Sequence, residues 1–465
     1  MKHLLSLLVV LTLTTTSAPL WAQQKANYDE ALVPEYELPD PLIFLDGTPV
    51  ASAEDWQRRR AEILQLIQDH VYGHVPAVDV DVDFVLVEED PEALDGLAHR
   101  KQIRMVFSNE YGDHTANLLI YLPNNVEPPV PTFLTLNFLG NHTIDDDPEI
   151  IIPSSWVRAG EDYGVTQHRA NERGRGVAKP RWPIRHILER GYGVAALYYG
   201  DIEPDHDGGF VQGVRRLFHQ GGQSQPAVDE WGAIAAWAWG CSRALDYFQT
   251  DDGIDHTRVA VMGHSRLGKT ALWAGASDPR FALVISNNSG CGGAALSRRR
   301  YGETVSIINH NFINWFADRF NDYIDHENDL PVDQHEVMAL VAPRPLYVAS
   351  AVEDRWADPR GEFLAAQAAS PVYELLGVAG LPADAMPEID HPVTGTIGYH
   401  VRTGKHDVTP YDWEQYLDFA DRHLKGRRDD SAPAGTGSTQ DQPPQNGAQP
   451  GDAEPSPAAA TNTDQ

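Results

Sequence analysis

The chain has 465 residues, with 36 Lys and Arg against 67 Asp and Glu, which gives a formal net charge of −31 at pH 7. Such a charge excludes a basic surface of the kind that binds nucleic acid or an anionic membrane. Hydrophobic residues make up 42% of the chain and aromatic residues 9%, so there is enough apolar material for a large core and wholesale disorder is excluded.

The N-terminus has the pattern of a secretory signal peptide. Lys2 precedes an apolar run over residues 4–13, and small and polar residues follow as far as Ala22. The run is too short to cross a bilayer, and no later segment has the ~20 apolar residues that a span requires. We therefore expect residues 1–22 to be a signal peptide and the protein to be exported, either periplasmic or secreted, with no membrane partner.

The expected elements begin with a helix over residues 53–71, where apolar residues recur every three to four positions. Two strands around a polar turn predict an antiparallel hairpin. Short strands and helices alternate after it, which predicts an α/β protein with a mostly parallel sheet and helices on both faces. The active site of such a sheet lies at the carboxyl ends of its strands. The hairpin strands are 99–107 and 115–122, the later strands 132–138, 192–198, 259–262, 283–285, 346–349 and 397–401, and the main helices 229–248, 269–276 and 411–424.

The C-terminal stretch differs in composition from the rest of the chain. Residues 429–465 contain no Lys, Arg, aromatic or large aliphatic residue, so they cannot bury enough apolar surface to fold. Between residues 23 and 428 there is no second linker and no internal repeat. We expect one folded catalytic domain over residues 23–428 and a disordered, low-complexity tail over 429–465.

One predicted strand end has the form of a nucleophile elbow, a tight turn between a strand and a helix that exposes a serine hydroxyl. Ser265 stands at this turn, with Gly263 before it and Gly268 after it. The strict G-x-S-x-G pattern would place the second glycine at position 267, so the match is partial. The alternatives are an ordinary turn with a capping serine, and a second serine, Ser242, which lies inside a predicted helix.

A serine hydrolase of this topology needs a carboxylate and then a histidine, in that order, after later strands. The strand at 346–349 is followed by Glu353, Asp354 and Asp358, all of which are candidate acids. The strand at 397–401 leads to His406, which we predict to be the general base. The rival His400 lies within the strand and is expected to be structural.

These residues resemble the bacterial branch of the glucuronoyl esterases, carbohydrate esterase family 15. The resemblance covers about residues 53–424 and rests on the segments 263–269, 288–294, 301–304 and 354–359. Members of the family have an α/β-hydrolase fold with a nucleophile elbow. They cleave esters between 4-O-methyl-glucuronate on xylan and lignin alcohols.

The resemblance implies a role for each matching residue. Ser265 would be the nucleophile, His406 the base, and Arg266 an oxyanion stabiliser through its guanidinium and backbone N–H. The sugar would be contacted by Lys269, Glu303 and Trp356, which offer an ammonium, a carboxylate and an indole.

One position departs from the fungal members, where the triad acid is a Glu in the segment that matches residues 287–290. Asn288 stands there in this chain, and an amide carries no negative charge to stabilise an imidazolium. The acid is therefore expected at the alternative bacterial position, with Asp354 ranked above Asp358 and Glu353 third. The fungal disulfide pairs are also absent, so Cys241 and Cys291 are expected to be reduced.

The sequence thus predicts a serine carboxylic ester hydrolase, a monomer, that acts on glucuronoxylan or lignin–carbohydrate esters through an acyl-enzyme. The alternatives are an acetyl xylan esterase or other carbohydrate deacetylase, and a catalytically silent carbohydrate-binding protein. The acidic stretches 201–207 and 145–147 lack EF-hand spacing, so no metal and no cofactor are expected.

Overall fold

The computed structural model describes residues 25–158, 160–219, 223 and 225–425. The predicted signal peptide, residues 1–22, and the predicted tail, residues 429–465, lie outside the described residues.

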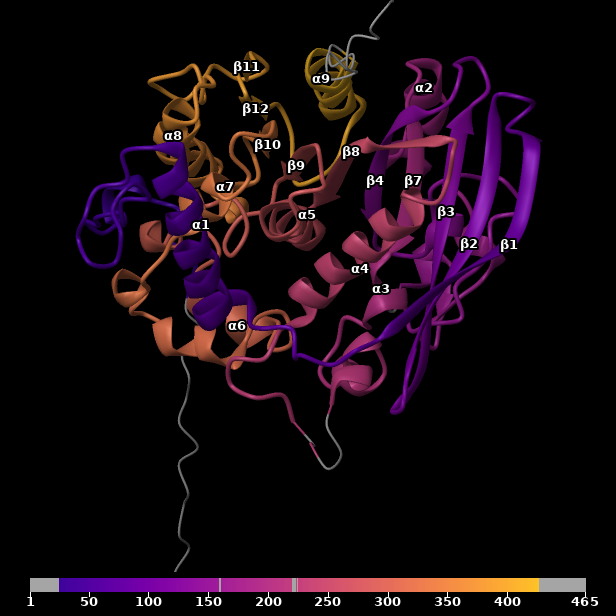
Figure 1. Cartoon of the computed structure of the whole chain (residues 1–465), viewed down its shortest axis with the longest axis horizontal. Helices are drawn as coiled ribbons and strands as arrows, with labels where there is room; N and C mark the ends of the chain where they lie inside the picture. Colours follow the sequence, from indigo (N-terminus) through magenta and orange to yellow (C-terminus); the bar gives the residue numbers. More distant parts are fainter. Residues whose placement is uncertain (1–24, 159, 220–222, 224, 426–465) are drawn as a thin grey trace, which may run out of the picture. The chain divides into compact units, whose positions relative to one another are not determined.

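A single large sheet organises the described chain, and Figure 1 shows its strands in order from β12 to β1. The order is β1 (Asp81–Ala93), β2 (Ala98–Asn109), β3 (Gly112–Pro123), β7 (Gly193–Tyr198), β4 (Val130–Asn137), β8 (Ile254–His264), β9 (Leu283–Asn287), β10 (Leu346–Ala351), β12 (Ile397–Arg402) and β11 (Val393–Thr394). From β7 to β12 neighbouring strands are parallel, whereas β1, β2 and β3 form an antiparallel extension and β11 an antiparallel edge. A separate two-stranded ladder joins β5 (Val165–Thr166) to β6 (Arg169–Ala170).

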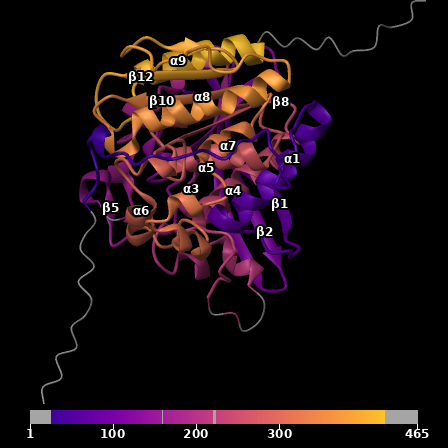
Figure 2. The same cartoon turned by 90° about the vertical axis from the view of Figure 1, so that its left-hand side faces the viewer.

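Helices cover both faces of the parallel strands, because these strands bury the side chains on each of their two sides. Neighbouring residues of β4 belong to different cores: Leu134 packs in the larger one and Phe133 in the smaller. Figure 2 shows α9 on one side of β10 and β12, with α5 and α7 on the other. The larger core holds α1 (Ala53–Ile67), α4 (Ala233–Phe248), α5 (Arg266–Ser277), α7 (Gln334–Ala339) and α8 (Pro359–Leu375), and the smaller holds α2 (Ile184–Glu189) and α9 (Pro410–Ala420). Two further short helices, α3 (Tyr199–Ile202) and α6 (Val305–Asn311), lie in connections.

The predicted fold class is confirmed, and the predicted strands and helices are present with shifted ends. The helix expected over 53–71 is α-helical only to Ile67 and continues as a wider turn to Tyr72. The helix expected from residue 269 begins at Arg266, directly after Ser265. Strand β1 was not predicted, because its Asp- and Glu-rich sequence belongs to an edge strand with few buried side chains. Within the described residues no helix has the length and apolar character of a membrane span.

Candidate active site

Ser265 stands between β8 and α5 in a conformation that L-residues rarely adopt, with φ 59° and ψ −128°. A Cβ at position 263 would lie 1.9 Å from the carbonyl oxygen of Leu267, so only glycine fits there. A Cβ at Gly268 would lie 3.0 Å from the carbonyl oxygen of Asn287 in β9, where the first turn of α5 passes the sheet. The close approach to β9 thus falls at position 268, which explains why the second glycine comes one residue later than in the strict pattern.

The predicted acid and base follow the adjacent parallel strands β10 and β12. In their register Ala351 pairs with Arg402, so the chains leave the sheet side by side. The amide of Glu353 donates to the carbonyl of Gly404 at 3.0 Å, which continues the pairing into the loops. As a result Nδ1 of His406 lies 2.6 Å from Oδ2 of Asp354. Asp354 is buried, whereas His406 is 40% exposed and therefore accessible to a ligand.

Asn288 contributes a contact that the sequence did not predict. It directly follows β9 with φ 45°, and its Nδ2 donates to Oδ2 of Asp354 at 2.8 Å. The same carboxylate oxygen therefore accepts from both Asn288 and His406. Four neighbouring strands, β8, β9, β10 and β12, thus place Ser265, Asn288, Asp354 and His406 at one edge of the sheet.

The other candidate acids are directed elsewhere. Asp358 binds Nε of Arg299 at 2.8 Å and caps α8 by accepting from the amide of Gly361 at 3.0 Å. Burial raises the pKa of the Asp358 carboxyl. Glu353 is exposed beside the strand end.

The rival histidine and the rival serine are also placed away from this constellation. His400 is fully buried, with Tyr347 at 3.0 Å and Asp412 at 2.9 Å from its ring nitrogens. Ser242 lies inside α4, as expected.

The guanidinium of Arg266 is held by a buried carboxylate, Asp205, through a short ion pair. The same carboxylate accepts from Nε1 of Trp315 at 2.7 Å and from the hydroxyl of Tyr199 at 3.1 Å. Burial alone would lower the pKa of Arg266, but Tyr199 and Asp205 outweigh it and raise the pKa, so the side chain stays charged. The guanidinium also lies over the Trp315 ring, 4.9 Å from its centroid.

Lys269 is buried one turn into α5, and each proton of its ammonium has an acceptor. It donates to the carbonyls of Ser289 and Cys291, both at 2.6 Å, and lies 3.3 Å from Oε2 of Glu303. A ligand hydroxyl that meets this ammonium must share it with the loop after β9. The sequence could not reveal this second, structural use of the lysine.

Seven residues were predicted from the sequence to take part in catalysis or sugar binding, and all of them line one cavity of about 330 Å³. Trp356 is 39% exposed and lies at its edge. Gly302 packs under this tryptophan, since a Cβ there would lie 2.4 Å from the carbonyl oxygen of Trp356. The seven are Ser265, Arg266, Lys269, Glu303, Asp354, Trp356 and His406, and Asn288 joins them.

The acidic stretches are engaged with donors of the protein. Asp201 accepts from Ser155 at 2.6 Å, and Asp147 from Tyr121 at 2.7 Å. No group of three or more metal-binding side chains occurs within the described part of the chain. Cys241 and Cys291 are both buried free thiols.

Comparisons with known proteins agree with this architecture. A family model described as glucuronyl esterase, fungi, matches residues 225–377. A carbohydrate esterase from an unknown prokaryotic organism is 52% identical over 91% of this chain and 98% of its own. The chain belongs to the glucuronoyl esterases, carbohydrate esterase family 15.

Other members of the glucuronoyl esterase family show the same relationship. A 4-O-methyl-glucuronoyl methylesterase of Schizophyllum commune is 31% identical over 73% of this chain and 74% of its own. A promiscuous family 15 esterase from a marine bacterial metagenome superposes with a TM-score of 0.81 at 53% identity, covering 86% of this chain and 100% of that one. The glucuronoyl esterase of Solibacter usitatus gives 0.80 at 46% identity, covering 84% and 99%. The family resemblance and the α/β-hydrolase fold predicted from the sequence are confirmed.

Proposed function

We propose that the protein is a serine esterase that hydrolyses esters of glucuronic acid, including its 4-O-methyl form, through an acyl-enzyme. The observation that carries the proposal is that one cavity is lined by all of these residues. They are the strained Ser265, the pair of His406 and Asp354, and the three residues that the family pattern assigns to the sugar, Lys269, Glu303 and Trp356. The names of the relatives support the substrate class.

In the first half-reaction Oγ of Ser265 attacks the uronic acid carbonyl while His406 takes the hydroxyl proton. The Asp354 carboxylate stabilises the resulting imidazolium and holds its ring orientation through the 2.6 Å contact. The alkoxide on the former carbonyl is stabilised by the Arg266 guanidinium and backbone N–H groups, where one donor is worth about 3 kcal/mol. Collapse of this intermediate breaks the ester C–O bond, and the imidazolium gives its proton to the leaving alcohol.

In the second half-reaction water replaces the alcohol. His406 takes a proton from the water, whose oxygen attacks the ester of Ser265, and returns it to Oγ when the uronic acid leaves. Each histidine protonation is matched by a release, so the free enzyme is regenerated.

The sugar is the acyl part of this substrate, which accounts for polar residues around the serine. Glu303 accepts hydrogen bonds from hydroxyls, and the exposed indole of Trp356 offers a flat apolar face. An acetyl group would leave both without a ligand, so an acetyl xylan esterase fits the cavity less well.

We further propose that the natural leaving alcohol is lignin-like.

We also propose that residues 1–22 are a cleaved signal peptide. Residues 23–428 would then form the exported catalytic domain, followed by a tail over residues 429–465. Mass spectrometry of the protein purified from a secreting host tests the processing. A mature chain that begins near residue 23 is expected, and an intact Met1 contradicts it.

Hydrolysis of benzyl glucuronate beside an acetylated xylo-oligosaccharide tests the function. We expect turnover of the uronate ester, its loss by several orders of magnitude in Ser265→Ala, and wild-type rates in the matched control Ser242→Ala, whose serine lies inside α4. Hydrolysis of the acetyl ester alone would indicate a deacetylase, and binding of the uronate without turnover would indicate a carbohydrate-binding protein.

A further inference from the structure

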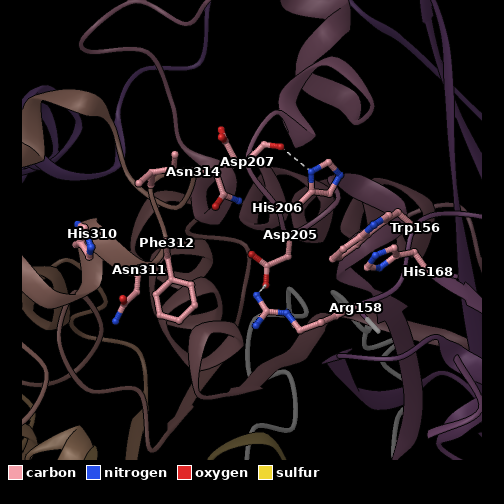
Figure 3. Close-up of a pocket in the computed structure, with 11 residues that line it drawn as sticks. Trp156, Arg158, His168, Asp205, His206, Asp207, His310, Asn311, Phe312 and Asn314 are labelled. Atoms are coloured by element: carbon pink, nitrogen blue, oxygen red, sulfur yellow. Dashed lines mark hydrogen bonds and ion pairs between the residues drawn. The ribbon is translucent and has the colours of Figure 1, made fainter. Parts of the chain in front are cut away.

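One border of the catalytic cavity is formed at the end of α6. Asn311 and Phe312 line the cavity there and also line a neighbouring cavity of about 440 Å³, in which Figure 3 shows them. The ring of Phe312 stacks on that of Trp315, with centroids 3.8 Å apart and 4° between the planes. This border is therefore held by packing within its own stretch of chain.

Two of the three residues that the family pattern assigns to the sugar, Glu303 and Trp356, lie on other short segments. We call residues 301–304, which precede α6, and residues 355–358, which precede α8, the sugar segments. The amide of Glu303 donates to the carbonyl of Trp356 at 2.9 Å, so the two sugar segments are in contact. Because Trp356 is 39% exposed, its position depends on the backbone of its segment more than on packing around its ring.

Both sugar segments are bound by a stretch of chain that is far away in the sequence, residues 27–30, which we call the strap. The amide of Gly302 donates to the carbonyl of Asn27 at 2.8 Å. The guanidinium of Arg355 donates to the carbonyl of Tyr28. The strap is therefore hydrogen-bonded to the residue directly before each of the two sugar residues.

Side chains add to these backbone contacts. The guanidinium of Arg355 lies over the ring of Tyr28, 5.1 Å from its centroid, and 5.9 Å from the centroid of Tyr301. The two tyrosine rings meet edge to face, with centroids 6.1 Å apart. At the end of the strap the carboxylate of Glu30 accepts from Arg299 at 2.8 Å. Since Tyr301 and Arg355 belong to different sugar segments, the ring of Tyr28 packs on both segments at once.

The catalytic residues are held by contacts of their own. Ser265 is fixed by the turn between β8 and α5. Asp354 accepts from Asn288 at 2.8 Å and contacts His406 at 2.6 Å. Loosening of the sugar segments would therefore weaken sugar binding while the reacting groups keep their places.

We propose that the strap sets the affinity for the sugar, with Tyr28 as a positioning residue that keeps the two sugar segments together. The inference rests on the proposed esterase function and deepens it, because Glu303 and Trp356 contact the sugar in that proposal. Both side chains can meet the same sugar only while their segments keep their spacing. Segments that are already ordered lose less freedom when the sugar binds, which favours binding.

The test compares methyl glucuronate with 4-nitrophenyl acetate, an activated ester that has no sugar. Tyr28→Ala is expected to raise KM for methyl glucuronate about fivefold with kcat within twofold of wild type, and to change kcat/KM for 4-nitrophenyl acetate less than twofold. Tyr28→Phe, which keeps the ring, should restore the wild-type KM. The matched control is Tyr111→Ala, since Tyr111 is also 40% exposed but lies in the turn between β2 and β3.

Hydrogen exchange followed by mass spectrometry gives a readout that needs no turnover. In Tyr28→Ala the amide of Gly302, which donates to the strap, should exchange about tenfold faster, while amides of β8 keep their wild-type rates. Faster exchange together with the rise in KM supports the proposal. Unchanged exchange, an unchanged KM, or equal losses on the two esters would overturn it.

The same experiments separate this proposal from the proposed function. Wild-type protein that hydrolyses 4-nitrophenyl acetate but no glucuronate ester would overturn the function. The exchange rate of Gly302 in Tyr28→Ala would then decide by itself whether the strap holds the two segments.

Discussion

Replacing Asp354 by Asn tests which carboxylate supports His406. Two donors face the Asp354 carboxylate, and both bind the same oxygen, Oδ2. They are Nδ1 of His406 at 2.6 Å and Nδ2 of Asn288 at 2.8 Å. An amide oxygen in that place keeps both hydrogen bonds and loses only the charge. With about 4 Å between the charge centres and an effective dielectric constant near 20, the imidazolium loses about 4 kcal/mol of stabilisation. This corresponds to a fall in kcat of about 10³-fold.

The loss is larger, about 10⁴-fold, if the amide turns its NH₂ to the ring and imposes the wrong tautomer. The assay is kcat on benzyl glucuronate, with the melting temperature as a check on folding. The matched control is Asp358→Asn, which breaks a buried pair with Arg299 and is expected to cost about 3 to 5 kcal/mol of stability. Its kcat should stay within a few-fold of wild type. A nearly active Asp354→Asn beside an inactive, well-folded Asp358→Asn would refute the reasoning.

Three further substitutions probe residues that support the site. Asn288→Ala removes one hydrogen bond to the Asp354 carboxylate, so kcat on methyl glucuronate should fall about tenfold with KM unchanged. An unaltered kcat would show that Asn288 only fills space. Asp205→Asn removes the negative charge that positions the Arg266 guanidinium, so kcat should fall by about 10- to 100-fold. This fall should exceed any rise in KM. A change in KM alone would contradict a role of Asp205 in positioning. Glu362 in α8 is fully buried and accepts from the amides of Ser289 and Gly290, which follow β9. Burial raises the pKa of its carboxyl from 4.5 to about 8, so the folded protein holds this proton more tightly than the unfolded chain does. Stability is therefore lost as the pH rises from about 4.5 to 8. Glu362→Gln should therefore show a flatter melting temperature than wild type between pH 5 and 8, and parallel curves would count against this account.

The sequence alone was enough to predict features that depend on steric contacts between neighbouring residues. The turn at Ser265 needs a residue without a side chain at position 263, and that requirement is visible in the sequence. The sequence also placed Ser265, Asp354 and His406 after three successive predicted strand ends, and in the structure they follow β8, β10 and β12. Strand β1 was missed because charged residues occupy an edge that faces solvent, so its alternation carries little apolar signal.

Contacts between distant segments could not be derived in the same way. Asn288 was recognised only as a departure from the family pattern, and its bond to Asp354 depends on β9 lying next to β10. Asp205 lies in an acidic stretch that the sequence analysis considered only as a metal site, and only the fold brings Arg266 and Trp315 to it. The three acceptors of Lys269 come from a loop whose path no periodicity predicts.

Asn288 and Asp354 follow neighbouring strands and meet at one carboxylate oxygen, which is also the oxygen that faces His406. A carboxylate at position 288 would lie beside that of Asp354, and two like charges in contact repel unless one of them holds a proton. The uncharged amide at position 288 therefore lets Asp354 remain ionised beside His406. An acid at position 288 would have to replace the charge of Asp354 rather than add to it.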